Sequence, residues 1–187
     1  MPEKEWVQLQ AGPVLALLAA YQPQDAQESL AKARIAAFVS QTPAFADHRT
    51  PVAHITASAW VTDPDRKKAL LLHHKKLDMW VQPGGHVDAS DTDLQSASLR
   101  ELLEETGLSD AQLVSSDIFD IDIHAIPARG DLSAHEHLDI RFWFESSMAS
   151  AIVSDESHEL AWMNRDDIAQ VTNEISIWRM VNKTLVA

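Results

Sequence analysis

Apolar residues recur along this chain with two periods, one typical of helices and the other typical of strands. Near the start they recur every three or four positions, which predicts helices over residues 14–21 and from residue 24 or 25 to about 40. Farther on, alternating and β-branched residues between Pro, Gly and Asp predict strands. These strands are expected over residues 52–62, 69–74, 112–125, 138–146 and 160–163, and a last helix over residues 175–186.

This order of elements predicts an α/β (α+β) fold with a mixed sheet, because the helices do not alternate strictly with the strands. A length of 187 residues suits one domain with an extension. We therefore divide the chain into an N-terminal helical extension, residues 1–47, and a domain, residues 48–187. We expect the extension to pack on the domain, while a homodimer contact or a wall of a substrate pocket stays open as an alternative.

The amino-acid composition limits the kinds of molecule that this protein is expected to bind. The net charge of -13 and the pI of about 4.9 argue against binding to nucleic acid polymers or anionic membranes, which depend on basic patches. The chain has no cysteine, which excludes disulfides, thiolate zinc sites and cysteine nucleophiles. The apolar stretch over residues 14–20 is too short for a signal peptide or a membrane span. These features fit a cytoplasmic protein.

The segment from Arg100 to Leu108 is the most informative part of the chain. Glu101, Glu104 and Glu105 share one face of a predicted helix, where three like charges repel one another. A hard divalent cation such as Mg2+ would turn that repulsion into binding. The other face is aliphatic and is expected to anchor the helix through Leu99, Leu102 and Leu103. Three glutamates alone would favour a solvated acidic surface, which is what most acidic helix faces are.

The residues ahead of this helix favour the metal site. Gly84 and Gly85 form a glycine turn, and Thr92 with Gln95 fits a capping box at the helix start. Gly107 is placed to end the helix in the left-handed conformation. We therefore expect a loop, a continuous helix from about residue 92 or 93 to 106, and a stop.

This unit resembles the Nudix box, G-x5-E-x7-R-E-U-x-E-E-x-G-U, where U is aliphatic. Every specified position from Arg100 to Leu108 matches. Asp91 stands where glutamate is usual, and the stretch from Asp91 to Arg100 is one residue longer than the pattern. We place the extra residue in the loop ahead of the helix, since an insertion within the helix would rotate all later helical residues by about 100°. Asp93 is an alternative to Asp91 as the acidic residue that takes the place of the first box glutamate.

The resemblance implies a Nudix-like α-β-α sandwich and a metal-dependent pyrophosphohydrolase acting on a nucleoside diphosphate derivative, with Mg2+ or Mn2+ as cofactor. It implies that Glu104 and Glu105 are the main metal ligands and that Glu101 completes the cluster. The backbone carbonyl of Gly85 is an additional candidate ligand. Arg100 is expected to form a salt bridge with Asp91 or Glu104 rather than to touch the metal.

Other roles are less well determined by the sequence. The general base lies either inside the box or outside it, where Glu159 is our candidate and Glu136 a weaker one. Candidate phosphate or substrate contacts, each equally explained as a surface residue, are Lys75, Arg141 and His86. On a strand His135 and His137 would share a face as a possible metal-ligand pair, although a polar edge explains them better than a dedicated zinc site.

Two other classes of protein compete with a hydrolase. A catalytically silent Nudix-fold module that binds nucleotides would typically lack a box glutamate, and all three are present here. An isopentenyl diphosphate isomerase of this fold uses a cysteine, which this chain lacks. The sequence does not identify the substrate beyond a small nucleotide-type molecule.

Overall fold

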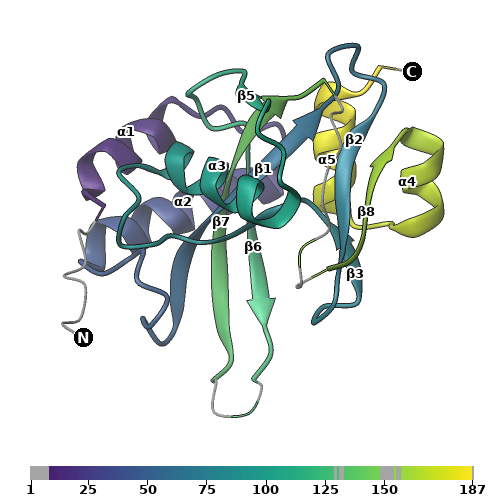
Figure 1. Cartoon of the computed structure of the whole chain (residues 1–187). Coiled ribbons are helices and arrows are strands. Elements are labelled where there is room, and N and C mark those ends of the chain that lie inside the picture. The colour runs from purple at the N-terminus through teal and green to yellow at the C-terminus, as the bar shows by residue number, and fades with distance from the viewer. Residues whose placement is uncertain (1–8, 129, 131–132, 148–153, 155–156, 187) are drawn as a thin grey trace.

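The structure is a computed structural model that describes residues 9–128, 130, 133–147, 154 and 157–186 (Figure 1). Its elements follow the order α1 (Ala11–Ala20), α2 (Ala26–Gln41), β1 (Ala53–Thr62), β2 (Ala69–His74), β3 (Met79–Val81), β4 (Gly84–His86), α3 (Leu94–Thr106), β5 (Gln112–Leu113), β6 (Asp120–Ile126), β7 (His135–Glu145), β8 (Ser157–Met163), α4 (Arg165–Val171) and α5 (Ile175–Thr184). The mixture of helices and strands confirms the predicted α+β class.

The described strands form one eight-stranded mixed sheet. Its main path runs β3-β2-β1-β7-β5, while β4 pairs with β1, β6 with β7, and β8 with β2. The pair β1–β7 is parallel and the other pairs are antiparallel. Helices α1, α2 and α3 lie on one side of the strands, and α4 and α5 lie on the other, so the sheet is covered by helices on both sides (Figure 1).

The central strands β1 and β7 have one apolar and one polar face. Their parallel register aligns Ile55 with Leu138 and Ala57 with Ile140, and these side chains join the core beneath α1, α2 and α3. Because side chains alternate between faces, His137, Asp139 and their neighbours two positions along lie on the opposite face. This face carries the polar side chains of the two strands.

A buried ionic network closes part of the polar face. Arg141 has no solvent exposure and pairs with Asp139 (Nε–Oδ2 2.7 Å) and Asp120 (Nη1–Oδ1 3.0 Å). From α5, Arg179 and Lys183 also reach Asp120, at 2.9 and 2.8 Å. Buried charges require such partners, since an unpaired buried ion costs several kcal/mol. The network therefore fixes α5 against the strands.

Helices α1 and α2 share the main core with the sheet. Val14, Leu18, Ile35 and Val39 are buried in the same cluster as the apolar face of β1. A side-chain cap supports α2, where Asp25 accepts from the Glu28 N–H at 2.7 Å. Along the described residues, no helix is long and apolar enough to cross a membrane.

Two sequence predictions about elements are wrong in detail. The strand expected over residues 112–125 is divided into β5 and β6. Between them Ser115 Oγ bonds Asp117 (N···Oγ 3.1 Å and Oγ···Oδ2 3.2 Å), and such local side-chain bonds compete with a strand ladder. On α3, Leu102 is fully buried and Leu99 packs on the core, but Leu103 is 40% exposed and does not anchor the helix.

Candidate active site

Helix α3 carries the box residues and is capped at both ends. Asp93, not Thr92, is the N-cap: its carboxylate accepts from the Ser96 N–H at 2.7 Å, and Ser96 Oγ accepts from the Asp93 N–H at 3.1 Å. The predicted cap is therefore one residue early, because Asp93 and Ser96 form the capping box instead. Gly107 ends the helix with a φ of 67°, as predicted. The helix is continuous from Leu94 to Thr106, as predicted.

A glycine turn brings the backbone against two glutamates of α3. The Gly84 N–H donates to Glu105 Oε2 at 2.8 Å. A Cβ placed on Gly85 would lie 2.7 Å from Cδ of Glu101, which is closer than real side chains approach. A side chain at this position would therefore displace the Glu101 carboxylate. Since β4 pairs Gly85 with Ala57 of β1, the sheet holds this turn in place.

Arg100 connects the loop and the helix through four groups. It donates to both carboxylate oxygens of Asp91, from Nε at 3.1 Å and from Nη2 at 2.9 Å. Nη1 donates to Glu101 at 2.9 Å and to Glu104 at 3.0 Å, and Nη2 also reaches the carbonyl of His86 at 2.8 Å. Both partners that the sequence offered for Arg100 are used. A bidentate charge pair of this kind fixes orientation as well as distance.

The acidic cluster is electrostatically crowded. Burial raises the pKa of Glu101, and the nearby carboxylates of Glu104 and Asp91 raise it further, although Arg100 opposes them. Glu105 is nearly buried, whereas the Glu104 side chain is 60% exposed. The cluster thus presents two sheltered carboxylates and one open one beside a glycine turn. This set of oxygen donors fits a hard divalent cation.

The other predicted site residues lie on elements outside the box. Glu159 lies within β8, is exposed, and is paired in register with His73. Lys75 is exposed in the turn after β2. Glu136 on β7 forms an ion pair with Arg34 of α2.

Arg141 is removed from the candidate substrate contacts. Its guanidinium has no exposed surface and is surrounded by the carboxylates of Asp120, Asp122 and Asp139. A buried group saturated in this way has nothing to offer a phosphate. The sequence suggested a substrate contact because the residues around Arg141 do not reveal its partners. Two of the three carboxylates come from β6, and the pairing of β6 with β7 is not visible in the local sequence.

Three histidines gather beside the box, and one of them was missed by the sequence analysis. His135 and His137 share a face of β7, as the strand period predicted. His54 of β1 joins them because the parallel register pairs it with His137. The exposed His86 also packs its ring against His54 and His137, with centroid distances of 4.9 and 5.1 Å. Only the pairing of distant strands reveals this group.

A cavity adjoins the box loop on the side of the N-terminal helix. Leu17 of α1 lines it together with Asp91 and Leu94 from the start of α3. The first helix therefore lies close to the box as well as in the core.

A curled mixed sheet with helices on both sides, and a glycine turn that leads into an acidic helix, defines the Nudix fold with its box. The family model described as the NUDIX domain matches residues 52–183, so the chain belongs to this family. No curated protein matches it.

Solved structures agree with this family at low sequence identity. A NUDIX-family hydrolase from Clostridium perfringens aligns with a TM-score of 0.52 and 22% identity, covering 70% of this chain and 94% of its own. A MutT NUDIX hydrolase from Burkholderia pseudomallei aligns with a TM-score of 0.53 and 20% identity, covering 72% of this chain and 98% of its own. An Ap4A hydrolase from C. elegans aligns with a TM-score of 0.53 and 18% identity, covering 69% of this chain and 93% of its own. These likenesses show the shared fold.

Proposed function

We propose that this chain is a metal-dependent hydrolase that cleaves a pyrophosphate linkage in a nucleoside diphosphate derivative by attack of water at phosphorus. The observation that carries the proposal is the convergence of Glu101 and Glu105 on the glycine turn at Gly84 and Gly85. A catalytically silent module of this fold typically lacks a box glutamate, whereas this chain has all three and an arginine that orders two of them. Their retention with this geometry favours a working site.

The residues that would hold the cation are Glu101, Glu104, Glu105 and the carbonyl of Gly85. When bound, Mg2+ or Mn2+ would neutralise phosphate charge and lower the pKa of a bound water. Arg100 holds Glu101 and Glu104 toward each other, and its bond to the His86 carbonyl fixes the loop relative to the helix. The protein thus pre-organises its carboxylates before substrate arrives, which reduces the cost of reorganisation.

The candidates for the general base and for substrate contacts are residues whose side chains are exposed to solvent. Glu159 is an exposed carboxylate on β8 and remains our candidate for a general base outside the box. Lys75 and His86 are exposed and remain candidates for substrate contacts. A small nucleotide-type substrate is supported by the names of two neighbours of the same fold, the C. elegans Ap4A hydrolase and an E. coli dihydroneopterin triphosphate pyrophosphohydrolase.

The proposal is tested by incubating the purified chain with a panel of nucleoside diphosphate derivatives and following release of phosphate or nucleoside monophosphate. We expect turnover with Mg2+ or Mn2+ and none with excess EDTA, with activity restored when the metal is added back. The exposed Glu174→Gln variant controls for the loss of a carboxylate outside the box. Full turnover in EDTA would contradict the metal assignment, and nucleotide binding without turnover of any panel member would favour the silent module.

A further inference from the structure

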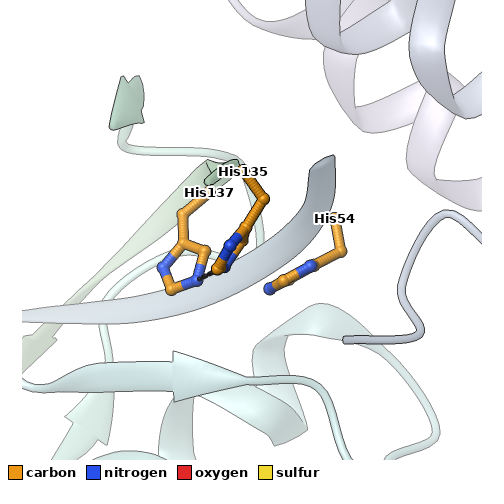
Figure 2. A group of neighbouring side chains, drawn as sticks. All are labelled: His54, His135 and His137. Atoms are coloured by element: carbon orange, nitrogen blue, oxygen red, sulfur yellow. Dashed lines mark hydrogen bonds between the residues drawn. The ribbon is translucent and has the colours of Figure 1, made fainter. Parts of the chain in front are cut away.

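Three histidine side chains from two strands converge on one point beside the box. His54 comes from β1, and His135 and His137 come from β7. Figure 2 shows their rings turned toward one another, with a hydrogen bond drawn between His135 and His137. One ring nitrogen from each histidine lies within 4.8 Å of the other two. This gathering brings three nitrogen donors together without a carboxylate among them.

The spacing of two of these nitrogens matches a tetrahedral metal site. The Nε2 atoms of His135 and His137 are 3.3 Å apart. Two nitrogens bound to tetrahedral zinc at about 2.0–2.1 Å are separated by roughly 3.3 Å. Small ring rotations would bring the third nitrogen to the same spacing, because no backbone movement is needed to turn an imidazole.

The other ring nitrogen of His135 is already oriented as in a metal-bound histidine. His135 Nδ1 lies 2.9 Å from the carbonyl oxygen of Ser133. A carbonyl only accepts, so Nδ1 carries the proton, and Nε2 of the neutral ring has a lone pair that faces the other histidines. Metal-binding histidines typically donate their second N–H to such a carbonyl, which fixes both tautomer and orientation.

His54 adds a second observation, because its ring is a buried polar group in the middle of the cluster. It is 1% exposed, and among the described residues neither ring nitrogen has a partner within standard hydrogen-bond geometry, although the backbone of Thr50 lies close enough to act on the ring. Buried polar atoms without partners are rare because they are costly. Burial and the neighbouring histidines lower the pKa of His54 to about 4, although the backbone of Thr50 opposes the shift. Burial and the same neighbours lower the pKa of His137 to about 3. Metal ions bind the uncharged form of the imidazole ring.

We propose that His54, His135 and His137 bind a divalent transition-metal ion, with Zn2+ as the representative, at a site separate from the carboxylates of α3. Imidazole nitrogens suit zinc and its neighbours, whereas Mg2+ prefers oxygen ligands. Three histidines leave one position of a tetrahedral ion open. The site adjoins the box, because the ring of His86 packs on His54 and His137 while its carbonyl accepts from Arg100.

The experiment measures Zn2+ binding to the metal-free full-length chain, by equilibrium dialysis with a competing chelator and by calorimetry. Co2+ is used in parallel as a spectroscopic probe, because tetrahedral nitrogen ligation gives strong visible absorption. We expect one tightly bound Zn2+ per chain and the tetrahedral Co2+ spectrum. In histidine-detected NMR, zinc should shift Nε2 of His135 and leave its Nδ1 protonated, because Nδ1 faces Ser133.

Variants distinguish this site from the box and from surface histidines. His135→Asn and His137→Asn should each weaken Zn2+ binding by more than about 100-fold, beyond the roughly 10–100-fold typical of losing a partner that only orients a ligand. His158→Asn is the matched control, since it removes one ring from another histidine pair (His73–His158 centroids 5.4 Å). Glu104→Gln should retain the tight Zn2+. Circular dichroism and thermal unfolding confirm that each variant is folded.

The proposal is overturned if the wild-type chain binds no Zn2+ more tightly than folded His135→Asn and His137→Asn do, which would make the group a stack of uncharged rings. It is also overturned if Glu104→Gln abolishes the tight Zn2+, which would place the ion in the carboxylate site. Neither result depends on turnover, so the proposal and the proposed hydrolase activity fail or succeed separately.

Discussion

Replacing Arg141 with methionine separates a structural role from a role in substrate binding. The guanidinium is fully buried and contacts Asp139 at 2.7 Å and Asp120 at 3.0 Å. Methionine fills much of the volume but leaves Asp139 without its nearest cation. Because breaking a buried ion pair from one side typically costs about 3–5 kcal/mol, we expect Arg141→Met to lose that much free energy of unfolding. This is a large part of the roughly 5–15 kcal/mol typical of a domain.

Urea unfolding measures the loss. With a slope of about 2 kcal/mol per molar, the midpoint should fall by about 2 M. Arg66→Met is the control: its side chain is 47% exposed and lies 3.5 Å from Glu145, so we expect a change of at most about 1 kcal/mol. Turnover per folded molecule should be nearly unchanged in Arg141→Met. A variant with wild-type stability and lost activity would refute this reasoning and return Arg141 to the substrate contacts.

The same network predicts how stability depends on pH. Burial alone would raise the pKa of Asp139, but Arg141 and His124 lower it well below its ordinary range. A carboxyl group with a depressed pKa contributes stability above the unfolded value of about 3.9, and this contribution is lost as pH falls below it. In Arg141→Met the largest influence that opposes burial is lost, and His124 alone of these two groups still lowers the pKa of Asp139. The difference in stability between the two proteins should therefore narrow as the pH is lowered below about 5.

Two further predictions concern the box. Glu104→Gln or Glu105→Gln should lower kcat by about 10²- to 10³-fold, the usual effect of removing one key electrostatic group, in steady-state assays with Mg2+; wild-type kcat in both would show that the metal ligands lie elsewhere. Gly85→Ala should lower activity, because its Cβ would lie 2.7 Å from Cδ of Glu101 and would displace that carboxylate; unchanged activity in Gly85→Ala would show that the site tolerates the displacement.

Much of the box was predictable because its information is local. The spacing of Glu101 and Glu105 with Gly107 specifies one helix and its end, and α3 agrees with it. The bond between Arg100 and Asp91 was expected from nearby residues and is present. The N-cap was displaced by one residue because several short polar residues compete for that position, and only the actual chain path selects Asp93.

The features that the sequence did not predict depend on contacts between distant segments. Arg141 looked like a surface charge because its partners come from β6, and β6 is held in turn by α5. The histidine pair on β7 looked like a polar edge because His54 is placed beside it only by the parallel register of β1 and β7. Local patterns specify elements, but the charge and ligand environment is decided by which strands become neighbours.

The parallel pair β1–β7 also constrains when the molecule becomes functional during synthesis. Thr56 and Asp139, bonded side by side in the sheet, are 83 positions apart. The acidic helix α3 is synthesised before β7, so its glutamates exist for a time without the completed sheet. Contacts so distant in sequence also slow folding, since a long loop must close before they form. The histidine group and the completed sheet therefore form only after β7 has been made.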